Sequence, residues 1–165
     1  SGVRPRSSSR VGQYDVGEQL GAGRYSTVRK ATDRRTGATV ALKRVQIFSI
    51  MDSKARGDCV NEVRALQALQ HPNIVRYADS FLEDNELVIV LEWADAGDLQ
   101  NLISRHKAAG EPLPDRTLWA VLRQAAAGLA HMHERRSMHR DLKPSNVFLG
   151  SDGAVKLGDL GLSRV

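Results

Sequence analysis

The chain is poor in cysteine, in aromatic residues and in long apolar runs, and each shortage excludes a class of protein. Cys59 is the only cysteine in 165 residues, so an internal disulfide is excluded and a reducing compartment is indicated. No apolar run is long enough to cross a bilayer, and the N-terminal residues lack the apolar core of a signal peptide. We therefore expect a cytoplasmic or nuclear protein with no membrane insertion.

The charge balance is basic, with a formal net charge of +5, but the placement of the basic residues does not favour nucleic acid. They are scattered between the N-terminal residues, a turn at Arg34-Arg35 and the pair Arg135-Arg136. Aromatic residues make up 5% of the chain and are not interleaved with them. A nucleic-acid surface needs a basic stripe on one face. Solvated surface charge is the better interpretation, and no nucleic-acid partner is expected.

Residues 1–13 are rich in serine and arginine and contain almost no apolar side chain. Such a composition cannot bury enough apolar surface to fold, so it predicts a disordered basic tail. Serines 7–9, which lie among arginines, are a candidate phosphorylation site, although a plain flexible end is the commoner meaning of such a stretch.

From Tyr14 onward, alternating and helical apolar patterns predict an α+β fold. Strand patterns separated by turns occupy residues 14–20, 27–32, 39–45, 74–81 and 86–93, and a helical pattern occupies residues 54–69. Further helices are predicted at 99–107 and 115–134, followed by short strands at 147–149 and 154–157. This order indicates a small sheet with one helix, then a helical region, arranged as two lobes with a cleft between them.

Two glycines between the first two predicted strands are candidates for phosphate binding. Gly21 and Gly23 lack side chains, so backbone N–H groups there can approach phosphate oxygens closely. A plain hairpin turn is the alternative, and Ser26 stands where a third glycine would complete a kinase-type loop. Because the stretch opens a strand and not a helix, it argues against a dinucleotide-binding Rossmann fold.

A lysine on the third predicted strand and a glutamate on the first predicted helix suggest an ion pair. Lys43 shares one strand face with Ala41, because alternate residues of a strand point to the same side. If Ala41 is buried, the Lys43 ammonium is drawn inward and needs an anionic partner. Glu62 lies in line with the apolar residues of its helix, which are Cys59, Leu66 and Leu69. An exposed glutamate is the alternative, but a carboxylate within an apolar stripe favours the Lys43–Glu62 pair.

The loop from His139 to Asn146, with Asp159 beyond it, carries the strongest chemical signal. Phosphoryl transfer depends on positioning and charge neutralisation more than on covalent help from the protein. Asp141 can orient a substrate hydroxyl by accepting its hydrogen bond, and Lys143 can neutralise charge on the transferred group. Asn146 and Asp159 offer hard oxygen ligands, which suit Mg²⁺ better than Zn²⁺.

Three histidines have structural interpretations. His139 could be read as a general base, but a packed structural role is preferred. His131 and His133 suggest a metal site, yet no cysteine or third ligand lies near them in the sequence. Both are therefore also interpreted as structural.

The sequence resembles a eukaryotic protein kinase. The resemblance is carried by four features in this order: the glycine loop, Lys43, Glu62 and the loop before Asp159. The stretch Lys143-Pro144-Ser145-Asn146 is similar to the serine/threonine class. Leu160 stands where most kinases have phenylalanine, which resembles the NIMA-related (never-in-mitosis-A) kinases, in particular the short ones that are little more than a catalytic domain. Three further stretches support that likeness: residues 45–48, 83–87 and 94–99. The resemblance covers residues 14–165.

The resemblance implies a serine/threonine kinase that transfers the γ-phosphate of ATP, with Mg²⁺, to hydroxyls of protein substrates. It also implies a cell-cycle role, regulatory protein partners and a location at the spindle or centrosome. It assigns Lys43 to the α- and β-phosphates, with Glu62 as its anchor, and the metal to Asn146 and Asp159. The remaining nucleotide contacts that it implies are an adenine sandwich of Leu20, Val28, Ala41 and Phe148, a gatekeeper at Leu91, and backbone bonds from Glu92 and Ala94. An apolar stack linking the lobes is implied for Leu66, Tyr77, His139 and Leu160.

By the same resemblance, residues 14–91 are the N-lobe and residues 92–165 are part of the C-lobe, with the hinge, the first helices and the catalytic loop. Kinases of this kind continue into an activation loop and further helices beyond the residues present here. An alternative expectation is therefore a catalytically incompetent module that binds ATP or a partner. We also expect the helix at 115–134 to expose part of its apolar surface.

Overall fold

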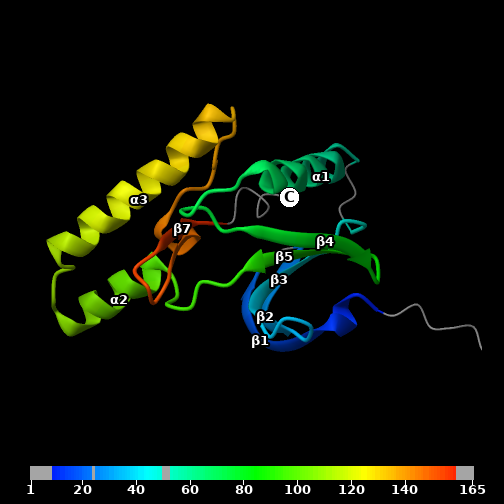
Figure 1. Ribbon diagram of the computed structural model, residues 1–165, viewed down its shortest axis with the longest axis horizontal. Coiled ribbons are helices and arrows are strands. Elements are labelled where there is room, and N and C mark those ends of the chain that lie inside the picture. Colours follow the sequence, from blue (N-terminus) through cyan, green and yellow to red (C-terminus); the bar gives the residue numbers. More distant parts are fainter. Residues whose placement is uncertain (1–8, 24, 50–52, 159–165) are drawn as a thin grey trace, which may run out of the picture. The chain divides into compact units, whose positions relative to one another are not determined.

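The computed structural model describes residues 9–23, 25–49 and 53–158, which fall into two compact units (Figure 1). The first unit contains residues 1–56 and 78–93, and the second contains residues 57–77 and 94–165. In helix α1 (Ser53–Ala68), several side chains lie outside this description, among them those of Cys59 and Glu62.

A five-stranded sheet forms the first unit, in the order β1-β2-β3-β5-β4. Its strands are β1 (Tyr14–Ala22), β2 (Ser26–Asp33), β3 (Thr39–Val45), β4 (Tyr77–Glu83) and β5 (Glu86–Glu92). The first three form the predicted antiparallel meander, and β3 pairs with β5 antiparallel as well. Asp84 and Asn85 join β4 to β5 with positive φ angles of 51° and 61°. Such a two-residue turn matches the twist of the strands it connects, and Asp and Asn tolerate this conformation well.

One face of the sheet packs into the core of the first unit. Its buried residues are Tyr14, Ala31, Leu42, Phe81, Val88 and Val90, with Val11 and Val40 packed against them. Leu42 lies opposite Val90 across the β3–β5 pairing, so the two side chains share this face. The neighbouring residues of β3, Ala41 and Lys43, therefore belong to the other face.

The predicted tail at residues 1–13 is wrong for residues 9–13. Val11–Gln13 form a short 3-10 helix, η1, that leads directly into β1. The Arg10 guanidinium lies 4.5 Å from the Phe81 ring centroid and forms an ion pair with Asp79. Composition did not predict that this segment is ordered, because it is held by contacts with β4, which is distant in sequence. Residues 1–8 lie outside the described part of the chain.

The predicted strand at residues 74–81 is also wrong in its first part, because β4 begins at Tyr77. Ile74 instead forms a parallel bridge to Leu157. The Val75 N–H donates to the Leu157 carbonyl at 2.8 Å. The predicted strand at residues 74–81 is therefore divided. Ile74 and Val75 pair with Leu157 of β7, and β4 begins at Tyr77.

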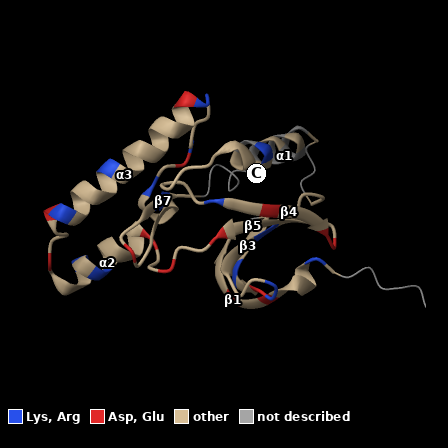
Figure 2. Cartoon of the chain, viewed as in Figure 1, with Lys and Arg blue, Asp and Glu red and all other residues tan. Residues whose placement is uncertain are grey.

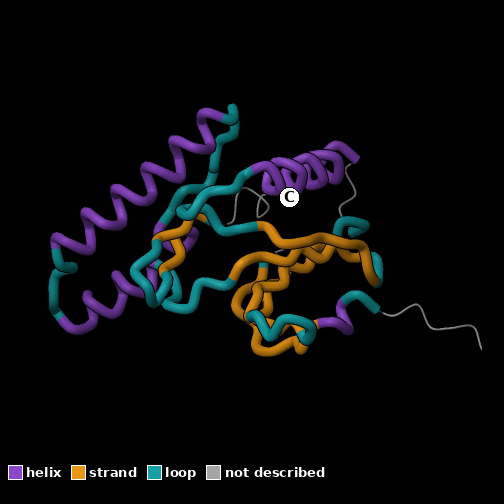
Figure 3. Tube along the Cα trace, in the orientation of Figure 1, coloured by secondary structure: helices purple, strands orange, loops and turns teal. Residues whose placement is uncertain are grey.

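The second unit is mostly helical (Figure 3). Besides α1 it contains α2 (Leu99–Ala109), α3 (Asp115–Glu134), a 3-10 turn η2 (Pro144–Asn146), and the hairpin β6 (Val147–Leu149) and β7 (Val155–Leu157). Asp98 caps α2 by accepting the Asn101 N–H at 2.8 Å, and Gly110 ends it with φ 68°. The core of the unit consists of Leu69, Ile74, Met132, Val147, Val155 and Leu157. Within the described residues, no helix has the length and apolar character needed to cross a membrane.

Helix α3 leaves part of its apolar surface in solvent, as expected. Leu118, Trp119 and Leu122 are 47%, 68% and 59% exposed. Val121, Ala125 and Leu129 of the same helix pack instead against the core of the second unit.

Lysine and arginine are scattered over both units, and acidic residues are scattered among them (Figure 2). This distribution accords with solvated surface charge. The expectation that no nucleic acid binds stays a prediction.

The loop before β4 is held tightly against α3 and β7. The Asn73 amide donates to Gln124 Oε1 at 2.8 Å and to the Val155 carbonyl at 2.9 Å. Gln124 Oε1 also accepts the Val155 N–H at 3.0 Å. Gly128 of α3 permits this approach, since a Cβ there would lie 2.7 Å from the Asn73 carbonyl oxygen and 3.1 Å from Leu157 Cδ1.

Replacing Gly128 with alanine is expected to destabilise the second unit, because the added methyl group must push the Asn73 loop away from α3. We expect the free energy of unfolding to fall by about 1–3 kcal/mol in urea denaturation. This loss would occur although alanine is favoured over glycine within helices by about 1 kcal/mol.

Gly57→Ala is the matched control, since a Cβ at Gly57 in α1 meets none of the described atoms within 4 Å. It is expected to be neutral or to stabilise by about 0.4–1 kcal/mol. Equal effects of the two substitutions would contradict the close contact at Gly128.

Candidate functional site

Five of the predicted nucleotide-binding residues lie on one face of the sheet. Val28 of β2 is opposite Lys43 of β3, and Gly21 of β1 is opposite Val28. Ala41 is opposite Leu91 of β5. Residues opposite one another in antiparallel strands share a face, and so do alternate residues of one strand. Strand register alone therefore gathers Gly21, Val28, Ala41, Lys43 and Leu91.

Lys43 is buried on this face, as its position beside Ala41 predicts. Its residue is 4% exposed, and Ala41 is 8% exposed. The next basic residue of β3, Arg44, points to the other side, where Arg44 Nε contacts Glu86 Oε2 at 2.5 Å. A buried ammonium is costly without anionic partners. The Glu62 side chain lies outside the described residues, so the Lys43–Glu62 pair stays a prediction.

The glycine hairpin between β1 and β2 is closed by its own backbone. The Gly23 N–H donates to the Ser26 carbonyl at 2.7 Å. A Cβ at Gly21 would meet no described atom within 4 Å, so none of the described side chains fills the space beside that backbone. This geometry fits a phosphate-binding loop and equally fits a hairpin turn. Leu20, predicted to touch adenine, is 40% exposed.

The segment after β5 runs beside β6 in the second unit. The Ala96 N–H donates to the Leu149 carbonyl at 2.9 Å, and the Leu149 N–H donates to the Gly97 carbonyl at 2.8 Å. These bonds tie the segment that begins at Ala94 to the strand that carries Phe148. Ala94 is 8% exposed. The backbone of Ala94 and the Phe148 ring, both predicted to contact adenine, therefore lie on connected elements of one unit.

Two polar residues of the predicted catalytic loop, Lys143 and Asn146, converge on Asp141. Lys143 Nζ lies 3.2 Å from Asp141 Oδ2, and the Asp141 side chain is 15% exposed against 53% for Lys143. The Asn146 amide nitrogen donates to the Asp141 backbone carbonyl at 2.8 Å and to Asp141 Oδ2 at 3.2 Å. The loop thus holds a carboxylate, an ammonium and an amide together in a fixed arrangement.

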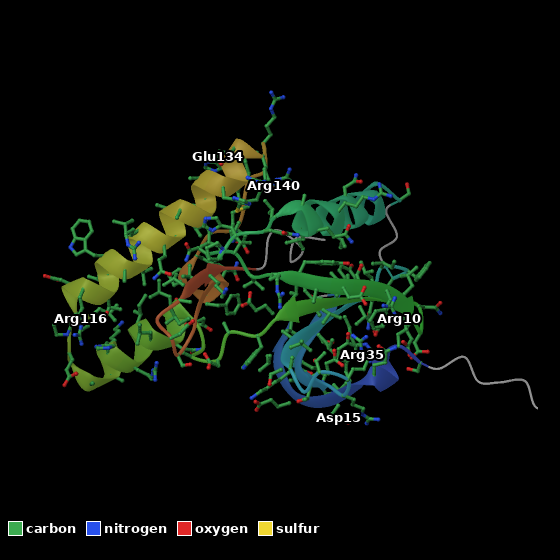
Figure 4. All side chains as sticks on the ribbon, in the orientation of Figure 1. Arg10, Asp15, Arg35, Arg116, Glu134 and Arg140 are labelled. Carbon is green, nitrogen blue, oxygen red and sulfur yellow. The ribbon has the colours of Figure 1, made fainter. Side chains whose placement is uncertain are left out.

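The backbone before Asp141 is shaped to present that carboxylate. Arg140, labelled in Figure 4, has a φ of 64°, a left-handed conformation that is uncommon for a residue with a side chain. The Asp141 N–H donates to His139 Nδ1 at 3.4 Å. His139 is 3% exposed. These contacts support the structural interpretation of His139, in which its buried ring helps to position the backbone at Asp141.

Asn146 is well suited to hold Mg²⁺. It is 5% exposed, and its amide nitrogen is committed to Asp141. The planar amide therefore directs its oxygen away from Asp141, and amide oxygens are ligands that Mg²⁺ accepts. The Gly158 N–H donates to the Asn146 carbonyl at 3.0 Å. Asp159, the second predicted ligand, and Leu160 lie outside the described residues, so their roles stay predictions.

Of the two histidines on α3, His131 has a ring contact, whereas His133 is exposed. The His131 and His71 ring centroids are 4.8 Å apart, at an interplanar angle of 43°. Burial, the Arg135 guanidinium and His71 together lower the pKa of His131, which favours the neutral ring. In the described part of the chain, no group of three His, Cys, Asp or Glu side chains is arranged to bind a metal ion. These contacts accord with a structural role for His131.

The sequence interpretation did not single out Gly158, which shapes the site beside Asn146. A Cβ at Gly158 would lie 2.6 Å from Phe148 Cε2 and 3.0 Å from Val75 Cγ2. The Phe148 ring therefore packs directly on the Gly158 backbone. A single glycine before an acidic residue carries no sequence signal for such packing, because the contact is made by a residue on another strand.

Residues 14–165 match the protein kinase domain family. Similar proteins include an Aurora kinase of Schizosaccharomyces pombe, 32% identical over 153 residues that make up 93% of this chain and 42% of that protein. A probable serine/threonine-protein kinase nek2 of Dictyostelium discoideum is 34% identical over 158 residues, 93% of this chain and 38% of that protein. The serine/threonine-protein kinase ATG1a of Arabidopsis thaliana is 33% identical over 161 residues, 96% of this chain and 25% of that protein. The chain thus spans less than half the length of each of these relatives.

Gly158→Ala is expected to displace the Phe148 ring and to lower the free energy of unfolding by about 1–3 kcal/mol. In a Phe148→Leu background the same substitution should cost less, because the smaller side chain leaves room for the methyl group. Urea denaturation of the four proteins in this double-mutant cycle measures the coupling, expected at about 0.5–3 kcal/mol. A Gly158→Ala cost that is the same in both backgrounds would show that Phe148 does not pack on Gly158.

Proposed function

The chain belongs to the protein kinase domain family, and from this premise we propose that it is a serine/threonine kinase. It binds ATP with Mg²⁺ and transfers the γ-phosphate to serine or threonine hydroxyls of proteins. The observation that carries this proposal is the catalytic loop, in which Lys143 Nζ and the Asn146 amide both contact Asp141 Oδ2. Phosphoryl transfer needs this combination of a carboxylate, a neutralising cation and a metal-binding amide.

Asp141 acts on the substrate hydroxyl. Its carboxylate is mostly buried and held by two neighbours, so it keeps one orientation. It accepts the hydrogen bond of the incoming hydroxyl and takes up the proton as the oxygen attacks. Lys143, whose side chain is half exposed, can extend to the transferred phosphoryl group and neutralise part of its charge. Asn146 and Asp159 would hold Mg²⁺, which when bound neutralises charge on the phosphates.

The sheet face supplies the nucleotide side of the proposal. Lys43 would contact the α- and β-phosphates, with Glu62 as its anchor. Gly21 and Gly23 would bring backbone N–H groups to the phosphates. The adenine ring would pack against apolar residues, with backbone bonds at its edge; these residues are Leu20, Val28, Ala41, Leu91, Glu92, Ala94 and Phe148. The shared face of Gly21, Val28, Ala41, Lys43 and Leu91 supports this assignment.

Within the family, we place the chain among the NIMA-related kinases. Leu160 after Asp159 and the stretches at 45–48, 83–87 and 94–99 support that placement. Similarity to the nek2 protein at 34% identity accords with it, and the Aurora and ATG1a relatives have comparable identities of 32% and 33%. A cell-cycle role, regulatory protein partners, and a location in the cytoplasm or nucleus and at the spindle or centrosome follow from this placement as proposals.

A module that binds ATP without phosphorylating proteins is the second candidate. The observation that favours it is strand register, which brings Gly21, Val28, Ala41, Lys43 and Leu91 to one face of the sheet independently of the catalytic loop. Nucleotide binding and phosphate transfer are therefore tested separately.

Mg-ATP is expected to stabilise the chain against heat, and Lys43→Met to abolish this effect. At a concentration ten times the Kd, ligand binding adds about 1.4 kcal/mol to the free energy of unfolding. The midpoint of thermal unfolding, measured by scanning fluorimetry, should rise by about 2–4 °C for each kcal/mol. Methionine keeps the length of the lysine side chain but removes the charge that contacts the phosphates.

Lys107→Met is the control, since Lys107 is an exposed residue in the last turn of α2. It should keep the full Mg-ATP stabilisation. No stabilisation of the unmodified chain, or equal stabilisation in Lys43→Met, would contradict the assignment of Lys43.

Phosphate transfer to a serine peptide is expected to depend on Asp141. Asp141→Asn should reduce incorporation of labelled phosphate by about 10²–10⁴-fold, since asparagine cannot take up the proton. Asn keeps an oxygen for the Asn146 amide, so the fold and the Mg-ATP stabilisation should persist. Asp84→Asn, in a surface turn that suits asparagine, is the control and should leave transfer unchanged. If the unmodified chain binds Mg-ATP but transfers no phosphate, the kinase proposal fails for this chain and the binding module stands.

A further inference from the structure

The N-terminal segment, defined here as residues 9–13, contacts β4 through hydrogen bonds and an ion pair (Figure 4, near Arg10). The Ser9 hydroxyl donates to Glu83 Oε1, and the Val11 N–H donates to Glu83 Oε2 at 2.8 Å. Arg10 forms an ion pair with Asp79 and stacks over the Phe81 ring at 4.5 Å. Both oxygens of the Glu83 carboxylate are thus occupied by one short segment.

Glu83 is charged at neutral pH in this setting. Partial burial raises its pKa, but hydrogen bonds from the Ser9 hydroxyl and from the backbone N–H groups of Val11 and Arg10 outweigh burial and lower the pKa. Arg44 lowers it further through its charge. The Ser9 hydroxyl therefore faces a carboxylate, to which it donates its hydrogen, and its oxygen accepts the Gly12 N–H of the same segment at 3.0 Å.

Among the described residues, the cations Arg10 and Arg44 near Glu83 already have acidic partners. Arg10 pairs with Asp79, and Arg44 Nε pairs with Glu86 Oε2 at 2.5 Å. A new negative group at Ser9 would therefore meet Glu83 directly. An ion pair between this group and Arg10 would require the Arg10 side chain to leave Asp79 and the Phe81 ring. The loss of those contacts would also loosen the segment.

Ser9 is accessible and lies in a basic sequence. Its residue is exposed. Arg4 and Arg6 precede it and Arg10 follows it. Arginines before a serine are a charge pattern that kinases with an acidic peptide-binding groove select. Ser7 and Ser8 belong to the same run, but Ser9 alone among the three lies in the described part of the chain.

We propose that Ser9 is a phosphorylation site and that its phosphorylation detaches the N-terminal segment from β4. In the modification, catalysed by an arginine-directed serine kinase, Ser9 Oγ forms a bond to the γ-phosphorus of ATP. The bond from that phosphorus to the bridging β–γ oxygen breaks, ADP leaves, and the hydroxyl proton passes to the modifying kinase and then to water. The hydroxyl donor is replaced by a group with a charge of about −1.5 to −2 that only accepts hydrogen bonds beside Glu83.

Detachment would uncover apolar surface of the sheet. Val11 packs against the core cluster of the first unit, which includes Tyr14 and Phe81. Tyr14, the first residue of β1, directly follows the segment and is 8% exposed. Phosphorylation at Ser9 is therefore a way to loosen the start of β1. This inference does not depend on the kinase activity proposed for the chain itself.

The decisive experiment compares amide hydrogen exchange in the unmodified chain and in a chain carrying phosphoserine at position 9, introduced during synthesis. Protection of the Val11 amide, which donates to Glu83, is expected to fall by about tenfold or more, in line with losing a hydrogen bond to a charged group. Amides of α2, which is remote in sequence, should be unchanged. Unchanged or increased protection at Val11 would overturn the proposal.

Two variants separate charge repulsion from simple loss of a donor. Ser9→Ala removes the donor without adding charge, so Val11 protection should fall less than in the phosphorylated chain. Glu83→Gln removes the repelling charge, so adding phosphate at Ser9 should then change Val11 protection little. An effect of phosphate as large in the Glu83→Gln variant as in the chain with the native carboxylate would overturn the repulsion argument.

A third measurement tests whether Ser9 is the residue modified. The chain is incubated with ATP and a purified arginine-directed serine kinase, and the phosphorylated residues are mapped by mass spectrometry. Phosphate is expected on Ser9, with a loss of about tenfold or more in Arg6→Ala, where an ionic contact to the acidic groove is removed. Phosphate confined to Ser7 or Ser8 would show that Ser9 is not the site.

Discussion

The burial of the Lys43 ammonium in an apolar strand is the constraint on which the proposed nucleotide site depends. With 4% of the residue exposed, the charge has lost most of its water, which is tolerated only beside anionic groups. The opposite face of the sheet is closed by the core around Leu42 and Val90. A phosphate-bearing ligand on the face with Gly21 and Val28 would meet that requirement. In the proposed function, the sheet is therefore both a scaffold and the source of the positive charge that contacts the nucleotide.

In the second unit, hydrogen bonds hold the buried polar residues around Asp141 in place. Asn146 is fixed by Asp141, and Gly158 donates to the Asn146 carbonyl, so the loop and the β6–β7 hairpin hold one another. The hairpin is in turn held through Gln124 and Asn73, which join α3, β7 and the loop before β4. This chain of contacts ties the geometry at Asp141 to the packing of α3. Destabilising the contact at Gly128 would therefore loosen the support of the catalytic loop.

Local patterns predicted the elements that depend on local chemistry. Alternation and turn residues were sufficient for β1 to β3, and strand periodicity was sufficient to place Lys43 beside Ala41 on a buried face. The pattern failed where contacts are distant in sequence. Residues 74–76 were predicted to belong to β4. Ile74 and Val75 instead pair with β7, where Leu157 is their backbone partner. Arg10 read as part of a disordered tail, yet the Phe81 ring and Asp79 hold it. The candidate catalytic residues were predicted from a combination of motifs, whereas the hydrogen bonds between them required the fold.

In the proposed function, the buried Lys43 lies at the phosphates of a bound nucleotide. An acyl phosphate derivative of ATP tests it directly, because such a probe transfers its acyl group to lysine amines beside the phosphates. Quantitative mass spectrometry of the treated chain should find acylation concentrated on Lys43 and Lys143, and excess Mg-ATP should suppress it. Labelling spread evenly over surface lysines such as Lys107, or labelling of Lys43 that Mg-ATP does not reduce, would contradict the account.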